Sequence, residues 1–126
     1  MILLDTHVLL WLVLEPRRLT RLATRALDTR RLLADISLRE VAAVERAGRM
    51  AFDEPVSEWL TDALEQFEVE VVPITPQIAA RSVRIAQNFH GDPADQLIAA
   101  TAIELDVALV TADEALRAAP TIRTIW

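Results

Sequence analysis

The sequence predicts an α/β fold in which a central parallel β-sheet is flanked by helices. Short apolar or β-branched runs alternate along the chain with longer segments whose apolar residues recur at helical spacing. The composition agrees, because 126 residues with 52% hydrophobic content and only two glycines are enough for one domain with a substantial core. We therefore expect a single domain over residues 1–126.

The first third of the chain is expected to contain two strands and two helices. Residues 2–4 form a short apolar strand that stops at Asp5, and a helix begins at Thr6. Apolar residues at helical spacing recur over residues 19–27. Residues 32–36 are the second strand candidate.

Two amphipathic helices and a third strand are expected in the middle of the chain. Ser37 opens a helix that Gly48 ends as a C-cap. Apolar residues at helical spacing over residues 56–67 predict the next helix. The β-rich run at residues 69–74 predicts the third strand.

The last third is expected to contain two longer helices and then three short elements. Pro76 starts a helix that reaches Phe89, and Pro93 occupies the first position of a helix that reaches Leu105. The short elements are a strand at residues 107–110, a helix at 114–118 and a β segment at 121–126.

Composition excludes several kinds of site. The chain has no cysteine, which excludes disulfides, thiolate metal sites and a cysteine nucleophile and suits a reducing cytoplasm. It has no lysine, which excludes a P-loop lysine and Schiff-base chemistry. The longest apolar run near the N-terminus, residues 8–14, is too short for a membrane span. We therefore expect a soluble cytoplasmic protein.

The net charge of −6 disfavours generic binding to nucleic acid, because phosphate contacts need positive charge. A cation or a local arginine patch would have to supply it. Six arginines do cluster between residues 17 and 31, although a solvated helix face accounts for most of them. His7 and His90 are more typical of structural or solvent-facing histidines than of a catalytic base.

Five acids that are distant in sequence share one kind of topological position. Asp5 and Asp113 follow predicted strands, and Glu40 lies in the first turn of a helix that follows another strand. Asp92 and Asp95 begin the helix that leads into the fourth strand. Ligands of open parallel sheets bind beyond the carboxyl ends of the strands, so these acids could converge on one edge of the sheet.

Clustered carboxylates repel one another and resist ionisation unless a cation lies among them. Asp5 in particular needs a partner, because it ends a buried apolar strand. Oxygen ligands without cysteine or a histidine pair suit Mg²⁺ or Mn²⁺ rather than Zn²⁺. Such a cluster can generate a hydroxide nucleophile and hold a phosphodiester for in-line attack.

Helix capping explains most of the same acids one at a time. Ser37 and Glu40 match the capping box S-x-x-E. Asp92 is suited to an N-cap, Asp95 to the positive end of the helix dipole, and Asp113 could cap the short helix after it. Only the joint placement of these acids favours a binding site.

The motifs LLDTHVLLW, ISLRE, HGDPADQLIAATA and LVTADE occur in this order along nearly the whole chain. Together they resemble the PIN-domain ribonucleases and, more narrowly, the VapC-type toxins of prokaryotic toxin–antitoxin pairs. The resemblance implies a PIN-like three-layer fold and a metal-dependent endoribonuclease that uses Mg²⁺ or Mn²⁺ to cleave RNA. It also implies inhibition by a cognate antitoxin and a homodimeric state.

The resemblance assigns roles to individual residues. The family's catalytic, metal-binding acids fall on Asp5, Glu40, Asp95 and Asp113, with Asp92 as an additional acid. We expect Asp5 and Asp95 to be the main ligands. The supporting residues are Thr6 and Thr111.

Two positions depart from the family pattern. Gln96 stands where the subgroup usually has an arginine, and Arg39 stands before Glu40 where a tryptophan is common. Arg39 is therefore expected to face either RNA phosphate or solvent.

Two other classes of function compete with this hypothesis. A phosphatase could use Asp5 as a covalent nucleophile, but such enzymes usually have a second aspartate at the position of His7, and a lysine. A pure interaction module would use the acids only as helix caps.

Overall fold

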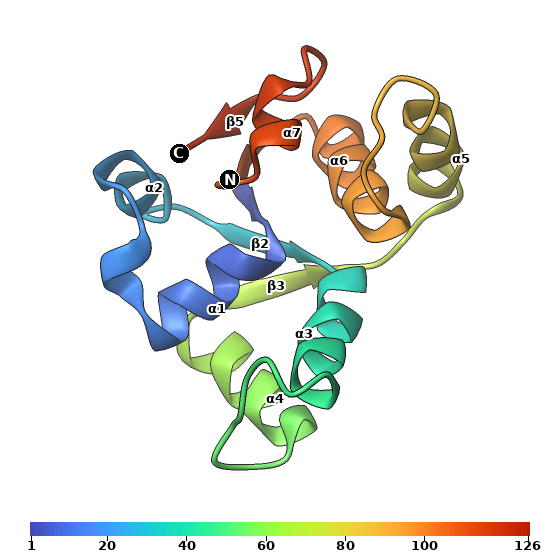
Figure 1. The fold of residues 1–126 in the computed structure, drawn as a ribbon. Helices are drawn as coiled ribbons and strands as arrows, with labels where there is room; N and C mark the ends of the chain where they lie inside the picture. The colour runs from blue at the N-terminus through green and yellow to red at the C-terminus, as the bar shows by residue number, and fades with distance from the viewer.

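The computed structural model describes residues 1–126 and contains a five-stranded, entirely parallel sheet in the order β3-β2-β1-β4-β5 (Figure 1). The strands are β1 (Ile2–Leu4), β2 (Arg31–Ala34), β3 (Val69–Val72), β4 (Ala108–Val110) and β5 (Thr124–Ile125). The helices are α1 (Thr6–Leu14), the 3₁₀ turn η1 (Pro16–Arg18), α2 (Arg21–Ala26), α3 (Ile36–Arg46), α4 (Val56–Gln66), α5 (Pro76–Ile85), α6 (Pro93–Leu105) and α7 (Glu114–Ala118). The predicted fold class, a parallel sheet flanked by helices, is confirmed.

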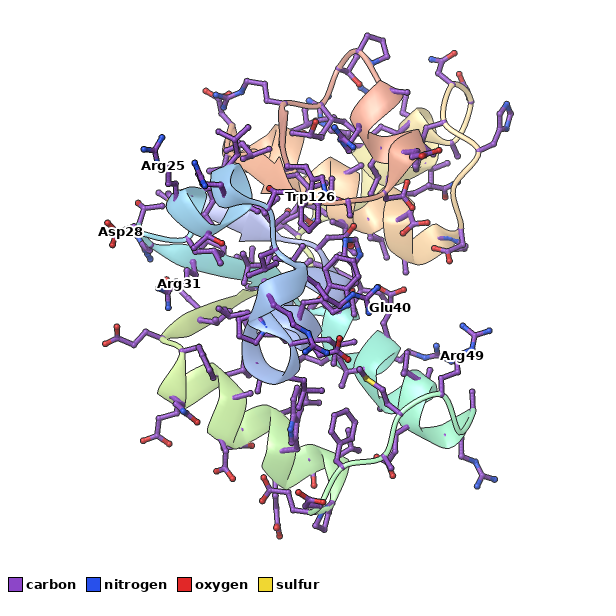
Figure 2. The ribbon with its side chains drawn as sticks, turned by 60° about the vertical axis from the view of Figure 1, so that its left-hand side comes forward. Arg25, Asp28, Arg31, Glu40, Arg49 and Trp126 are labelled. Atoms are coloured by element: carbon purple, nitrogen blue, oxygen red, sulfur yellow. The ribbon has the colours of Figure 1, made fainter.

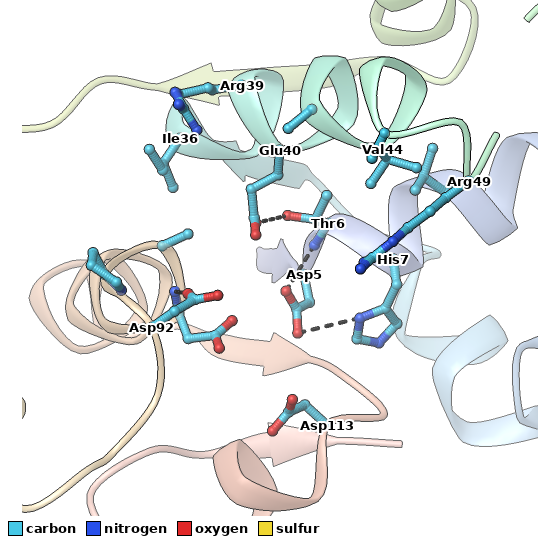
Figure 3. Close-up of a pocket in the computed structure, with 16 residues that line it drawn as sticks. Asp5, Thr6, His7, Ile36, Arg39, Glu40, Val44, Arg49, Asp92 and Asp113 are labelled. Carbon is cyan, nitrogen blue, oxygen red and sulfur yellow. Dashed lines mark hydrogen bonds and ion pairs between the residues drawn. The ribbon is translucent and has the colours of Figure 1, made fainter. Parts of the chain in front are cut away.

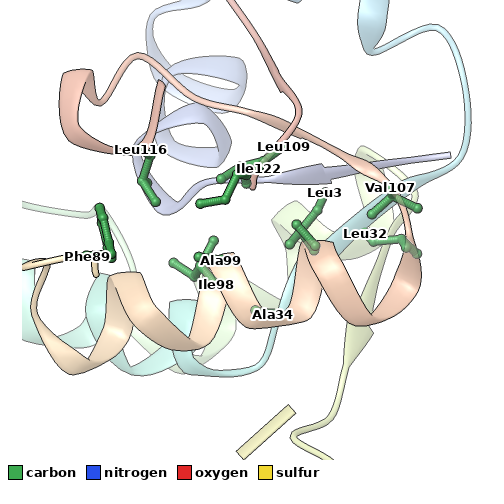
Figure 4. Packing of buried hydrophobic residues seen from close by; sticks show 11 residues of the cluster. Leu3, Leu32, Ala34, Phe89, Ile98, Ala99, Val107, Leu109, Leu116 and Ile122 are labelled. Carbon is green, nitrogen blue, oxygen red and sulfur yellow. The ribbon is translucent and has the colours of Figure 1, made fainter. Parts of the chain in front are cut away.

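Helices cover both faces of the sheet, because the strands are apolar on both sides. Ile2 and Leu4 of β1 point to one face, where they pack with Val8 and Leu9 of α1 and with residues of α2. Leu3 points to the other face, where it packs with α6 and α7 (Figure 4). A third cluster joins α1, α3 and α4: Leu10, Val41, Trp59 and Ala63.

The order of the strands reverses direction between β1 and β4. From β1 the chain moves outward to β2 and then β3, and it returns to the other side of β1 with β4. In open parallel sheets such a reversal leaves a crevice at the carboxyl ends of the two central strands. Asp5 directly follows β1 and Thr111 directly follows β4, so both residues lie at this crevice.

Helix α6 is built to pack closely on the sheet. Asp92 is its N-cap and Pro93 its first residue, as predicted. Ala99, Ala100 and Ala102 are buried, and their small side chains let the helix backbone approach the strands. The helix therefore holds Asp95, in its first turn, at the edge of the crevice.

Several predicted boundaries were wrong by a few residues. The second strand ends at Ala34 and not at residue 36, because Asp35 adopts a helical conformation and α3 begins at Ile36. The third strand ends at Val72, before Pro73, and the N–H of Ile74 donates to Oδ2 of Asp35 (3.0 Å) rather than to a strand.

Two more predicted elements are shorter in the structure. The helix predicted to reach Phe89 ends at Ile85, and the last β segment is limited to Thr124–Ile125. Gly48 does end α3: its φ is +74°, and the N–H groups of Gly48 and Arg49 donate to Glu45 and Val44. None of the helices combines the length and apolar character needed to cross a membrane.

Candidate active site

Asp5 forms the floor of the crevice and is only 4% exposed. Its Oδ1 accepts a hydrogen bond from the N–H of Thr6 (2.8 Å), and its Oδ2 accepts one from the hydroxyl of Thr111 (2.6 Å). Thr111 is completely buried, so this bond joins the ends of β1 and β4 inside the protein. The partner that the sequence required for Asp5 is therefore supplied by two threonines.

His7 lies beside this floor and has a structural contact. Its Nε2 accepts a hydrogen bond from the N–H of Ala112 (3.0 Å), while its Nδ1 lies 3.5 Å from Oδ2 of Asp5. Burial lowers the pKa of His7, against the opposing effect of Asp5 and Asp113. A neutral ring that accepts at Nε2 carries its proton on Nδ1, facing Asp5. No local sequence pattern indicated this contact between α1 and the loop after β4.

Asp113 lies on the β4 side of the crevice. Its Oδ1 accepts a hydrogen bond from the N–H of Leu116 (3.0 Å), which confirms the predicted N-cap of α7. Its own N–H donates to the hydroxyl oxygen of Thr111 (3.0 Å). Thr111 thus connects Asp5 and Asp113 in one hydrogen-bonded unit.

Glu40 does not form the predicted capping box with Ser37. Because α3 begins at Ile36, Ser37 lies inside the helix and cannot be its N-cap. Instead, the Thr6 hydroxyl donates to Oε1 of Glu40 and also lies 2.8 Å from the Ser37 hydroxyl (Figure 3). Burial raises the pKa of Glu40, the Thr6 hydrogen bond opposes this, and the charges of Asp5 and Asp92 add to the rise.

Asp92 and Asp95 occupy the opposite side of the cleft, at the start of α6. Oδ1 of Asp92 accepts a hydrogen bond from the N–H of Asp95 (2.9 Å), so Asp92 is a cap as predicted. The Asp95 carboxylate accepts no hydrogen bond from the chain. Burial first, and then the charges of the four surrounding acids, raise the pKa of Asp95 to about 7.

Glu40, Asp92 and Asp95 come close enough together to share a cation. Each offers one carboxylate oxygen, and these three oxygens all lie within 4.8 Å of one another. A set of oxygen donors on partly exposed carboxylates fits a hard divalent cation such as Mg²⁺ or Mn²⁺. Asp5 and Asp113 line the same cleft but do not belong to this closest group, whereas Asp92 does.

The cleft has a volume of about 730 Å³ and is not lined by acids alone. Ile36 and Val44 of α3 form an apolar wall, and Arg39 and Arg49 border it. Gln96, which replaces the arginine expected from the resemblance, donates from Nε2 to the carbonyl of Gly91 (2.9 Å). It therefore ties down the loop that precedes α6.

The fold and the site together define a class: a parallel α/β protein with five carboxylates around the crevice between its two central strands. The family model described as PIN domain matches residues 2–121. Ribonuclease VapC22 of Mycobacterium tuberculosis (strain ATCC 25618 / H37Rv) is 41% identical over 129 residues, which span 99% of this chain and 98% of that relative. The chain therefore belongs to the PIN-domain family, and its resemblance to the VapC type is confirmed.

Solved structures of toxin–antitoxin complexes share the fold. VapBC2 from Rickettsia felis, bound to a promoter DNA fragment, gives a TM-score of 0.73 at 17% identity, with coverage of 98% of this chain and 97% of that chain. DNA-bound VapBC from Salmonella typhimurium gives 0.70 at 22% identity, with coverage of 98% and 95%. A toxin–antitoxin complex from Klebsiella pneumoniae gives 0.68 at 22% identity, with coverage of 97% and 95%.

Proposed function

We propose that this protein is the toxin of a toxin–antitoxin pair and a Mg²⁺-dependent endoribonuclease that hydrolyses RNA phosphodiester bonds in the cytoplasm, with Mn²⁺ as the alternative ion. The observation that carries the proposal is the convergence of Glu40, Asp92 and Asp95 within 4.8 Å in the cleft of a PIN fold. The 41% identity to a relative named as a ribonuclease supports the same activity.

The five acids have different tasks in this proposal. Glu40, Asp92 and Asp95 would hold the cation, and Asp5 and Asp113 complete the negative field around it. The bound ion supplies a Lewis acid that offsets phosphate charge and makes a water molecule more acidic. Thr6 and Thr111 keep Glu40 and Asp5 in position through their hydroxyl groups.

Arginines at the border of the cleft would bind the substrate. Arg39 and Arg49 are exposed, line the cleft and form no ion pair with a carboxylate. A guanidinium group binds phosphate in a bidentate way and is suited to RNA at this position. Arg39 therefore faces phosphate in this proposal, which was one of its two expected roles.

The alternative of a phosphatase with Asp5 as nucleophile has less support. Both oxygens of Asp5 already accept hydrogen bonds from Thr6 and Thr111, and the residue is buried. A covalent nucleophile needs one oxygen free to reach phosphorus. The geometry favours a positioning and electrostatic role for Asp5.

We also propose a cognate antitoxin as partner and a homodimer as the assembled state. The solved relatives were obtained as toxin–antitoxin complexes, two of them on DNA. A cleft lined by five carboxylates is complementary in charge to a basic side chain of an inhibitor.

Cleavage of a structured RNA by the purified protein tests the activity. We expect cleavage with Mg²⁺, none with EDTA, and a loss of at least roughly a hundredfold, about 2.7 kcal/mol, in Asp5→Asn and Asp95→Asn. Asp62→Asn, which removes an exposed acid on α4, is the control and should cleave normally. Cleavage that persists in EDTA and in both site variants would contradict the proposal.

A further inference from the structure

A second groove lies between α2, α7 and β5 and has a volume of about 560 Å³. We call it the arginine–tryptophan groove, after its lining by Leu22, Arg25, Arg117, Thr124 and Trp126. Arg25 and Arg117 are exposed, and neither forms an ion pair or a side-chain hydrogen bond. Leu22 is 59% exposed, which is unusual for a leucine of a small domain. The groove therefore offers free positive charge next to apolar and aromatic surface.

A row of aromatic rings connects this groove to the acidic cleft. The ring centroid of Trp126 lies 5.6 Å from that of Trp11 and 6.4 Å from that of His7. His7 in turn lines the cleft beside Asp5. In Figure 2, Trp126 lies between Arg25 on one side and Glu40 on the other. A chain that leaves the cleft past His7 meets Trp126 and then the two arginines.

Arg18 adds a further positive charge along this row. Its guanidinium carbon lies 4.0 Å above the centroid of the Trp11 ring, in a cation–π contact. Its only acidic neighbour is Glu15, at 4.0 Å and well exposed, which is a weak pairing. Arg18 therefore carries its positive charge beside the ring row without a strong acidic partner.

The groove supplies positive charge for RNA beside the acidic cleft. Five carboxylates and a net charge of −6 repel a polyanion, so an RNA strand needs positive contacts on either side of the cleft. Proteins that bind single strands combine arginines for the phosphates with aromatic rings on which bases stack. The arginine–tryptophan groove has both elements, and its Trp126 ring lies 6.4 Å from the ring of His7, which lines the cleft.

We propose that the arginine–tryptophan groove binds the single-stranded RNA segment that flanks the cleaved bond, with Arg25 and Arg117 on phosphates and a base stacked on Trp126. This inference rests on the proposed ribonuclease function and adds the path of the substrate. An acidic peptide would also be complementary to the arginines, but its acidic side chains would not stack on the aromatic rings between the groove and the cleft. We therefore favour RNA as the occupant.

Binding of a fluorescein-labelled single-stranded RNA of about twelve nucleotides, measured by anisotropy in EDTA, tests the proposal without cleavage. We expect the Arg25→Gln/Arg117→Gln variant to bind roughly tenfold more weakly. Its plot of log affinity against log salt should be less steep by about 1.4, since each phosphate contact on a single strand contributes about 0.7. Trp126→Phe should also weaken binding by several-fold, because the indole stacks more strongly than a phenyl ring.

Arg84→Gln is the matched control, because Arg84, like Arg117, is an exposed arginine in the last turn of a helix with no ion pair. It lies on α5, which is on the opposite side of the molecule from α2 (Figure 1). The control should keep both the affinity and the salt dependence of the wild type. Equal affinities for the double variant and the control, or no RNA binding by the wild type, would overturn the proposal.

Two further results would distinguish an RNA groove from a peptide groove, and failure of the groove from failure of the proposed ribonuclease activity. Binding of labelled poly-glutamate that is lost in the double variant, and that RNA does not displace, would show a peptide groove and would also overturn the proposal. The binding test in EDTA is independent of cleavage. If the wild type never cleaves RNA but the double variant still shows the expected loss of binding, the result contradicts the proposed function and not the groove.

Discussion

Two groups of carboxylates line the acidic cleft: the floor, Asp5 and Asp113, and the rim, Glu40, Asp92 and Asp95. They differ most between Asp5 and Asp95. On the floor, Asp5 and Asp113 accept hydrogen bonds from backbone N–H groups, and Asp5 also from Thr111. On the rim, Asp95 accepts none, and its pKa rises to about 7. The floor carboxylates are thus stabilised by hydrogen bonds within the protein. Of the other rim carboxylates, Glu40 and Asp92 each accept one hydrogen bond, and only Asp95 is half-buried among like charges without a donor.

This difference separates residues that hold the fold from residues that await a ligand. A carboxylate with satisfied hydrogen bonds contributes to stability, and its removal leaves buried donors without partners. A carboxylate held among others without donors reduces stability until a cation binds. Removal of the Asp5 carboxylate and removal of the Asp95 carboxylate should therefore change the stability with opposite signs.

Asp5→Ala should have the largest effect and should act on the floor. It leaves the N–H of Thr6 and the buried hydroxyl of Thr111 without their acceptor, so we expect a loss of about 2–3 kcal/mol in the free energy of unfolding. Urea denaturation measures this loss. An Asp5→Ala protein that is more stable than the wild type would show that Asp5, like Asp95, destabilises the metal-free fold, and would contradict the distinction between them.

Gly91→Ala should disturb the rim through packing rather than charge. A Cβ at this position would lie 2.3 Å from Cε1 of Phe89 and 2.9 Å from Cβ of Asp95. Because Phe89 is buried, we expect a cost of about 2 kcal/mol and a weaker response to Mg²⁺. Gly48→Ala, at φ +74° with open space around it, is the comparison and should cost only about 1 kcal/mol. Equal costs at the two positions would contradict the packing argument.

Asp95→Asn should stabilise the metal-free protein. The folded-state pKa of Asp95, about 7, is above its ordinary value of 3.8, so the wild type loses stability as the pH rises from about 4 to 7 and stays lower above that. Because Asp95 is half-buried and solvent screens its charge, we expect a gain of about 1 kcal/mol above pH 7 and none below pH 4. Thermal melts in EDTA across this pH range measure it, and a pH-independent difference would contradict the assigned cause.

Asp92→Ser should have the smallest effect on stability and should separate the two roles of Asp92. Serine keeps the N-cap of α6 and removes the charge, so the free energy of unfolding should change by less than about 0.5 kcal/mol. The pKa of Asp95 should fall, because Asp92 is the strongest of the charges that raise it. Carboxyl chemical shifts followed by NMR would show this fall, and an unchanged pKa would mean that burial alone is responsible.

The sequence predicted the fold well because its pattern is local. Alternating strand and helix signals, together with Pro93 and Gly48 at helix ends, depend only on neighbouring residues. The error at the end of β2 came from one long-range contact. The end of β2 at Ala34 could not be recognised, because the next residue, Asp35, accepts a hydrogen bond from Ile74, which is 39 residues away.

The sequence predicted which acids would lie together in one cleft, but not which groups each acid would contact. The shared position after strands brought all five acids to one cleft. Whether an acid caps a helix, contacts a threonine or remains unpartnered depends on residues from other elements. Glu40 shows this best: its contact with Thr6 joins α3 to α1, and the local S-x-x-E pattern indicated a capping box that does not form. The links from His7 to Ala112 and from Trp126 to Trp11 had no local signal for the same reason.

Calorimetric titration with Mg²⁺ tests the central claim most directly, namely that the rim carboxylates form the cation site. We expect one class of site in the wild type and in the Asp62→Asn control, and an affinity lower by roughly tenfold or more, about 1.4 kcal/mol, in Asp95→Asn. Equal Mg²⁺ affinity in all three proteins, or no binding by the wild type, would contradict the account.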